Sequence, residues 1–152
     1  MVSSVPFMPS ASDLLANRRR VLVTGGAGFI GGAVVRRLLR ETEATVYNLD
    51  KMGYASDLTS IEQVLSDLGQ SSEGRHHFLH VDLCDATAVN AAVQRANPDL
   101  VMHLAAESHV DRSISGPGVF IQSNITGTYN LLQAVRDHFE SLKGERKNEF
   151  RF

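Results

Sequence analysis

The sequence of 152 residues contains one cysteine, Cys84, and no tryptophan. A single cysteine excludes a disulfide within the chain, and its surroundings lack the Cys/His spacing of a zinc site. There is also no long block of one charge, because 15 basic and 17 acidic residues are interspersed and give a formal net charge of −2. Without a basic field, we expect neither nucleic acid nor a membrane surface as a partner.

Residues 1–19 contain no apolar run of signal-peptide length, and the three arginines at 18–20 follow the weakly apolar stretch instead of preceding it. Together with the lone cysteine, this predicts a reducing, cytoplasmic location. We expect residues 1–18 to form a loose arm and residues 19–152 to form one domain.

Short β-branched runs alternate with segments of helical periodicity along the rest of the chain. Strands are expected at 21–23, 45–50, 77–81 and 100–104, and helices at 29–39, 57–68, 85–96 and 119–139, with a polar loop before the last. A helix between successive strands is typical of parallel crossovers, so the predicted fold class is α/β, a doubly wound parallel sheet (Rossmann). Residues 143–151 are expected to be a solvated connection, and 149–152 to begin a fifth strand at which the domain is truncated.

A glycine-rich segment, Gly25-Gly26-Ala27-Gly28-Phe29-Ile30-Gly31, lies between the first predicted strand and the first predicted helix. This context is typical of a dinucleotide-binding turn, in which a missing side chain at Gly28 lets a pyrophosphate approach the amides of the helix N-terminus. Asp50 ends the second predicted strand, roughly twenty residues further on, where a carboxylate can accept hydrogen bonds from ribose hydroxyls.

The charge of Asp50 would repel a ribose 2′-phosphate, which favours NAD over NADP, although the neighbouring Lys51 could offset part of that repulsion. The alternative is a glycine turn that serves packing only, with Asp50 as an ordinary surface acid. Context, spacing and the acid together favour a cofactor site.

Four segments are similar to the dTDP-glucose 4,6-dehydratases, a family of extended short-chain dehydrogenases acting on nucleotide sugars. They are Thr24–Gly31, Asn48–Ala55, Val81–Asp85 and, as the most discriminating, Leu104–Ile114. The resemblance extends from about Arg20 to Phe152.

The resemblance implies an NAD site assembled from these segments. The pyrophosphate turn would be lined by Gly25, Gly28, Phe29, Ile30 and Gly31, and the adenosine ribose would be held by Asp50, Lys51, Met52 and Gly53. The adenine would be flanked by Asp82 and Leu83, and the nicotinamide half would lie beside Leu104, Ala105, Ala106, Glu107 and Ser108. Ser123 would contact the cofactor from the long helix. Ser108 would also bind the sugar, and at Ser123 the family pattern has threonine, which keeps the hydroxyl. For Asp82 the alternative is a helix-entry acid, and residues 104–106 could simply pack at a strand end.

The activity implied is the NAD-dependent dehydration of dTDP-glucose to dTDP-4-keto-6-deoxyglucose, in the biosynthesis of dTDP-rhamnose and surface polysaccharides. In such enzymes a tyrosine of a helical Tyr-x-x-x-Lys pair removes a proton while a hydride passes to NAD, and acidic residues then expel water. These groups are expected beyond residue 152, so we predict no catalytic residue here and an inactive chain on its own. Tyr47 and Lys51 match the pair formally, but they lie on and just after a strand, about 13 Å apart.

Two other functions remain open. A UDP-glucose 4-epimerase or UDP-glucuronate decarboxylase would share the glycine turn and Asp50 and differ in the loop at 107–112. A non-catalytic NAD-binding module is the other possibility. By resemblance, full-length relatives would bind a nucleotide-sugar substrate and pair as homodimers.

The remaining polar residues of interest have simpler interpretations. His76, His77 and His80 lack a carboxylate or thiolate at ligating spacing, so no metal site is predicted. His103 is expected to pack in the core, whereas for His109 a substrate contact and a surface ion pair are equally compatible with the sequence. We expect Asn124 to bond locally and Gly127 to permit close helix packing.

Overall fold

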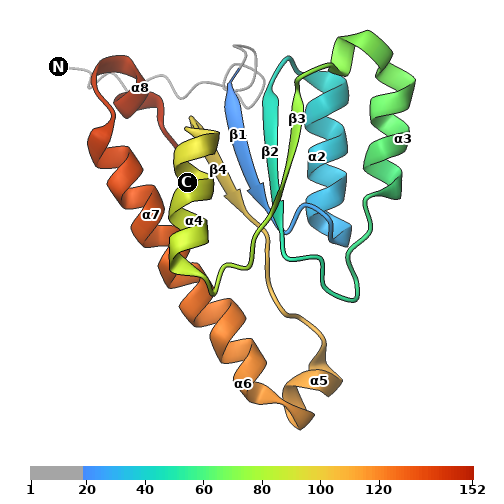
Figure 1. The fold of residues 1–152 in the computed structure, drawn as a ribbon, viewed down its shortest axis with the longest axis vertical. Coiled ribbons are helices and arrows are strands. Elements are labelled where there is room, and N and C mark those ends of the chain that lie inside the picture. Colours follow the sequence, from blue (N-terminus) through green and yellow to red (C-terminus); the bar gives the residue numbers. More distant parts are fainter. Residues whose placement is uncertain (1–18) are drawn as a thin grey trace, which may run out of the picture.

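The computed structural model describes residues 19–152, apart from the side chains of residues 110, 112 and 113, so the predicted arm lies outside the described residues. Four parallel strands form one sheet in the order β3-β2-β1-β4 (Figure 1). They are β1 (Arg20–Thr24), β2 (Thr45–Asp50), β3 (His76–His80) and β4 (Leu100–His103). This arrangement confirms the predicted fold class.

Helices cover both faces of the sheet, with α2 and α3 on one side and α4 and α7 on the other (Figure 1). The helical segments are α2 (Phe29–Glu41), α3 (Thr59–Leu68), the 3₁₀ turn η1 (Gly69–Ser72), α4 (Ala86–Ala96), α5 (Val110–Ser115), α6 (Pro117–Phe120), the π-helical turn η2 (Ile121–Thr126), α7 (Gly127–Ser141) and α8 (Gly144–Glu149). No helix among the described residues is long and apolar enough to cross a membrane.

The central strand β1 is apolar at successive positions because both of its faces are covered. Val21 and Val23 pack with α2 and α3, whereas Leu22 packs with α4 and α7, and all three side chains are fully buried. Burying one such side chain stabilises a fold by about 1.5–3 kcal/mol. Because a strand covered on both faces cannot alternate between apolar and polar residues, the run is continuous in the sequence.

Three segments differ from the expectations drawn from the sequence. The polar loop expected before the long helix contains the six-residue α5, and the connection expected at 143–151 contains α8. The helix expected at 119–139 belongs to a longer helical stretch, Pro117–Ser141, which is interrupted by η2. Helices of one or two turns are too short to show a clear periodicity, which explains why the sequence pattern missed them.

The end of the chain lies beside the open edge of β4. Arg151 forms an isolated parallel bridge with Leu100, its amide donates to the Asp99 carbonyl at 3.3 Å, and its carbonyl accepts from the Val101 amide at 3.0 Å. This is the place at which a fifth parallel strand would join the sheet.

The N-terminus of α4 offers a simple test of local stability. The Asp85 carboxylate accepts a hydrogen bond from the Ala88 amide at 3.0 Å and so caps the helix. We expect Asp85→Ala to lower the free energy of unfolding by about 1 kcal/mol, because one amide of the first turn loses its partner. Urea titration followed by circular dichroism would measure this loss. Asp85→Asn keeps the acceptor and is the control, and an equal loss in both variants would contradict the capping role.

Candidate functional site

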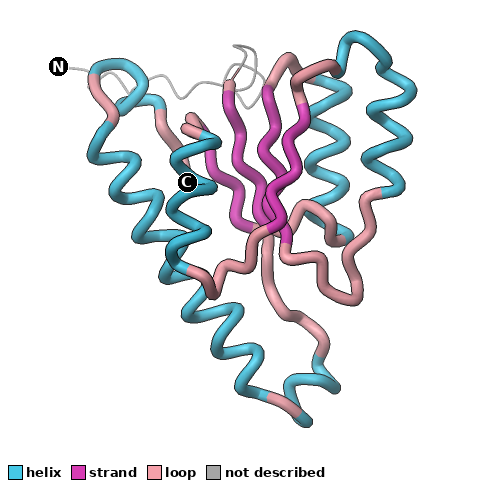
Figure 2. Tube along the Cα trace, viewed as in Figure 1, coloured by secondary structure: helices cyan, strands magenta, loops and turns pink. Residues whose placement is uncertain are grey.

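The carboxyl ends of the four strands meet at one edge of the sheet, where the loops that follow them gather (Figure 2). A cleft of about 400 Å³ opens there. It is lined by residues from five segments far apart in the sequence: Gly25, Gly28, Phe29, Ile30, Leu49, Asp50, Lys51, Gly53, Tyr54, Ala55, Ser56, Val81, Asp82, Leu83, Leu104, Ala105, Ala106, Glu107, Ser108, His109 and Ser123. Open parallel sheets bind ligands at this edge.

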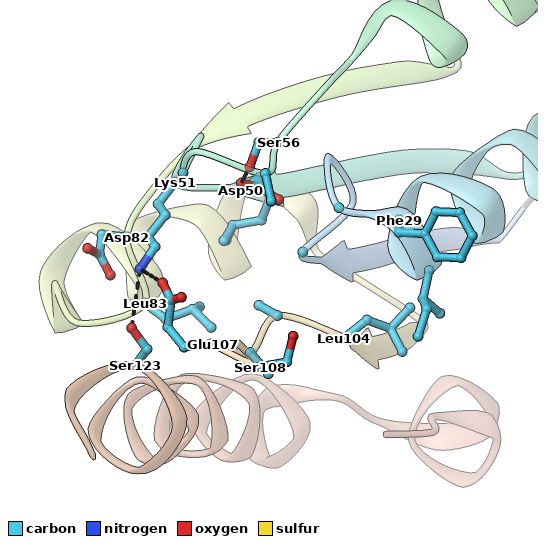
Figure 3. A pocket seen from close by; sticks show the side chains of 18 of the residues that line it. Phe29, Asp50, Lys51, Ser56, Asp82, Leu83, Leu104, Glu107, Ser108 and Ser123 are labelled. Carbon is cyan, nitrogen blue, oxygen red and sulfur yellow. Dashed lines mark hydrogen bonds and ion pairs between the residues drawn. The ribbon is translucent and has the colours of Figure 1, made fainter. Parts of the chain in front are cut away.

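All of the predicted cofactor residues except Gly31 and Met52 line this cleft. Gly31 lies beneath the turn, and Met52 has a φ angle of 57°, with its amide donating to Asp50. A direct contact with the cofactor stays a prediction for Gly31, for Met52 and for the residues that line the cleft. Figure 3 places Phe29 at one end of the cleft and Lys51, Asp82 and Ser123 at the other.

Sequence reasoning missed Ser56, whose hydroxyl donates to the Asp50 carboxylate at 3.0 Å. No sequence signal marks it, because its position depends on how the chain turns back after β2. His109 was considered for a substrate contact and lines the cleft, where its ring meets the edge of Tyr54 at a centroid distance of 5.1 Å.

The glycine turn packs so closely that two of its residues cannot carry a side chain. Gly25 has a φ angle of +73°, and a Cβ atom there would lie 2.6 Å from the backbone of Ala105. A Cβ atom on Gly31 would lie 2.1 Å from the Gly25 carbonyl oxygen. The turn, the loop after β4 and the first turn of α2 therefore meet backbone to backbone.

The N-terminus of α2 faces the cleft without a capping group. Its N-cap residue, Gly28, makes no side-chain hydrogen bond, and the first turn holds no acidic residue. Amides in the first turn of a helix have no partner within the helix, so they are available to an anion. Phe29 and Ile30 are 95% and 66% exposed beside them, an unusual placement for large apolar side chains.

Asp50 is buried and already accepts three hydrogen bonds. One carboxylate oxygen accepts from the Ala27 amide at 3.1 Å, and the other accepts from the Met52 amide at 2.8 Å and from Ser56. Asp50 thus ties the glycine turn to the loop after β2. A carboxylate offers about four acceptor positions, which leaves one for a ligand hydroxyl.

Lys51 reaches across the cleft to Glu107 and Ser123 (Figure 3). The ammonium nitrogen lies 2.7 Å from a Glu107 carboxylate oxygen and 3.2 Å from the Ser123 hydroxyl. Burial alone would lower the pKa of Lys51, but the hydrogen bond and the charge of Glu107 outweigh it and raise that pKa. The Lys51 cation is therefore already neutralised by a partner.

The π-helical turn η2 fixes the loop that carries Glu107. The Asn124 side chain accepts from the Glu107 amide at 2.8 Å and donates to the Glu107 carbonyl at 2.9 Å, so it bonds to a loop 17 residues earlier in the chain, whereas the sequence suggested local bonding. Gly127 confirms its predicted packing role, since a Cβ atom there would lie 2.9 Å from that of Leu83. The Asp82 carboxylate accepts from the Cys84 amide in the turn before α4, whose N-cap is Asp85, and Asp82 also lines the cleft, so its contact with adenine stays a prediction.

The other polar residues considered in the sequence lie apart from this chemistry. Tyr47 is buried at a centroid distance of 4.8 Å from His77, and its hydroxyl accepts from Arg20, so it does not pair with Lys51. His80 contacts the Lys51 carbonyl, and His76 is near Asn48. Among the described residues there is no group of three or more His, Cys, Asp or Glu side chains that could hold a metal ion.

Comparison with known proteins places this arrangement among nucleotide-sugar enzymes. A family model described as GDP-mannose 4,6 dehydratase matches residues 22–152. The chain is 50% identical over 133 residues to the dTDP-glucose 4,6-dehydratase of Salmonella typhimurium, which covers 88% of this chain and 35% of that protein. It is 48% identical over 134 residues to the enzyme of the same name from Neisseria meningitidis, covering 88% and 36%. The chain thus spans about a third of the length of these relatives.

Solved structures of such enzymes are also similar to this chain. A dTDP-glucose 4,6-dehydratase from Streptomyces venezuelae with NAD bound matches with a TM-score of 0.64 and 40% identity, covering 78% of this chain and 36% of that one. A UDP-glucose-4-epimerase from Stenotrophomonas maltophila, also with NAD, matches with a TM-score of 0.65 and 31% identity, covering 79% and 34%.

We expect alanine substitutions at two adjacent glycines of α2, Gly31 and Gly32, to change the free energy of unfolding in opposite directions. Gly31→Ala forces a Cβ atom into the Gly25 carbonyl, so we expect it to destabilise the fold by about 1–3 kcal/mol. Gly32→Ala is the matched control, since its Cβ atom would make ordinary contacts at 3.4 Å and alanine favours a helix by up to about 1 kcal/mol. Urea unfolding of both variants measures the difference, and equal stabilities would refute the close packing of the turn.

Proposed function

Because the chain belongs to the GDP-mannose 4,6 dehydratase family, we propose that it is the NAD-binding part of a dTDP-glucose 4,6-dehydratase. The observation that carries the proposal is the cleft at the carboxyl edge of the sheet, in which the glycine turn, the uncapped N-terminus of α2 and Asp50 converge. The identity of 43–51% to several dTDP-glucose 4,6-dehydratases supports this activity over the alternatives in the same family.

The residues present fit a dinucleotide in one orientation. The amides at the start of α2 would bind the pyrophosphate, beside Gly28, Phe29 and Ile30. The free acceptor position of Asp50 would bind an adenosine ribose hydroxyl, with Lys51, Met52 and Gly53 alongside. Asp82 and Leu83 would flank the adenine. The nicotinamide half would run along residues 104–108. Ser123, which lies with Lys51 and Asp82 at one end of the cleft, would be a further contact with the cofactor.

Electrostatics favours NAD over NADP. Asp50 brings a negative charge to the ribose end of the cleft. Lys51 is the one lysine or arginine among the lining residues, and it is held by Glu107 at 2.7 Å. A 2′-phosphate would therefore meet the carboxylate of Asp50 without a free cation to offset it.

For the whole enzyme, we propose the conversion of dTDP-glucose to dTDP-4-keto-6-deoxyglucose in nucleotide-sugar biosynthesis. NAD, when bound, would supply a reversible hydride acceptor. This chain's part is to bind and orient the cofactor and, through Ser108, to approach the sugar. The acid-base groups are assigned to the part of the relatives that this chain does not cover, so the chain alone should not turn over substrate.

We further propose that the full-length enzyme is a cytoplasmic homodimer. The helical stretch Pro117–Ser141 supports a buried interface in the whole protein, because it presents a stripe of exposed apolar side chains. They are Ile121, Ile125, Tyr129 and Leu132.

Cofactor binding by the 152-residue chain tests the proposal most directly. We expect saturable NAD binding by calorimetry, and at least about tenfold weaker NADP binding, because the repulsion from Asp50 amounts to roughly 1–2 kcal/mol. Asp50→Asn should weaken NAD binding and reduce the ratio of the affinity for NAD to the affinity for NADP. Asp57→Asn is the control, since Asp57 lies on the same loop outside the lining residues. A folded chain that binds no NAD would contradict the proposal.

The assignment of the reaction has its own test. Incubation of the chain with NAD and dTDP-glucose should yield no 4-keto sugar, measured by chromatography of the nucleotide sugars. Formation of the keto sugar by this chain alone would show that reacting groups lie within it and would overturn the division of roles proposed above.

A further inference from the structure

A histidine that the proposed function does not use joins three elements behind the cleft. His103 is the last residue of β4, and Thr24 is the last residue of β1. The Nδ1 atom of His103 lies 2.7 Å from the Thr24 hydroxyl, and its Nε2 atom lies 2.9 Å from the hydroxyl of Thr128 on α7. Thr24 is fully buried and His103 is half-buried.

The protons in this chain of hydrogen bonds can be assigned by counting. The Thr24 hydroxyl oxygen accepts from the Ala105 amide at 3.3 Å and from the Leu104 amide at 3.2 Å, and the Leu104 amide is shared with the Thr24 carbonyl at 3.1 Å. A hydroxyl has two acceptor lone pairs and one proton, so Thr24 has only its proton left for His103. Nδ1 of His103 must then accept. A neutral ring with an accepting Nδ1 carries its proton on Nε2, which donates to Thr128.

The two amides that Thr24 holds belong to one wall of the cleft. Leu104 and Ala105 line it, and so does Gly25, the residue after Thr24. Gly25 and Ala105 are in backbone contact, as the 2.6 Å approach of a Cβ atom built on Gly25 indicates. The Thr24 hydroxyl therefore contributes, with the Thr24 carbonyl, to the contacts that join the glycine turn to the loop after β4.

We propose that His103, as the neutral Nε2–H tautomer, is a positioning residue that aims the Thr24 hydroxyl and so holds the two walls of the cleft at the spacing that a dinucleotide requires. For the ligand, this inference rests on the proposed function. Protonation at Nδ1 would turn the acceptor into a donor, and Thr24 would need a third lone pair. The contact would break, and the Thr24 hydroxyl would lose its fixed direction toward the amides of Leu104 and Ala105.

The surroundings of His103 disfavour that protonation. Its neighbours are Thr24 on β1, Thr128 on α7 and the ring of Phe152 at a centroid distance of 6.4 Å. Burial lowers the pKa of His103 from its usual value of 6.5, and no charged group among the described residues adds to this shift. Because the folded pKa is the lower one, the neutral relay is complete above pH 6.5 and is lost as the pH falls through the folded pKa.

The tautomer can be tested without a variant and without a ligand. Nitrogen-15 NMR of the histidine-labelled 152-residue chain at pH 7.5 should show His103 with a protonated Nε2 and an unprotonated Nδ1. The opposite tautomer, or a charged ring at that pH, would overturn the proposal. A chain that binds no NAD at any pH would contradict the proposed function. The NMR measurement would then be the test of the hydrogen bonds between Thr24, His103 and Thr128.

The effect on binding is tested by the pH profile of NAD affinity. We expect the NAD affinity of the wild-type chain to fall as the pH is lowered from 7.5 through the folded pKa of His103, by about tenfold for each pH unit below that pKa. His103→Gln cannot be protonated, so its affinity should be lower at pH 7.5 but should change little with pH. His109 itself lines the cleft, and His109→Gln should keep the pH dependence of the wild-type chain. A profile that His109→Gln flattens and His103→Gln preserves would refute the role of His103.

Discussion

The close approach of three backbone segments is the constraint on which the rest of the structure depends. Gly25 meets Ala105, and Gly31 meets the Gly25 carbonyl, at distances that leave no room for a Cβ atom. These contacts bring the ends of β1 and β4 and the start of α2 together, and the cleft is the space that they leave at the edge of the sheet. The glycines thus act by allowing backbone amides to converge, which a side chain at either position would prevent.

Polar contacts then hold the cleft in shape from its two sides. Asp50 links the glycine turn to the loop after β2 through Ala27, Met52 and Ser56. On the other side, Asn124 and the Lys51–Glu107 ion pair fix the loop after β4. Because Asp50 and Lys51 are adjacent in the sequence but are bonded to opposite walls, the end of β2 connects both halves of the site.

The parts of the site that could be predicted are those whose positions follow from residues close together in the sequence. The glycine turn and Asp50 follow from a strand, a turn and a helix in order, and the strand at 45–50 has the bounds that its β-branched run indicated. Ser56 and the relay through His103 could not be predicted, because they depend on contacts between residues far apart in the chain. The apolar neighbours of His103 in the sequence predict a core position, whereas the structure leaves it half-buried at the end of β4 between two threonine hydroxyls.

Two successive residues of the π-helical turn η2 contact the two loops that meet at one end of the cleft. Neighbouring side chains on an α-helix diverge by about 100°, so Ser123 and Asn124 would normally face different directions. The wider i→i+5 turn of η2 reduces that divergence, and Ser123 contacts Lys51 while Asn124 holds the Glu107 backbone. Through these two contacts, η2 joins the end of β2 and the loop after β4 to the helical stretch that follows, so three elements far apart in the sequence form one wall of the cleft.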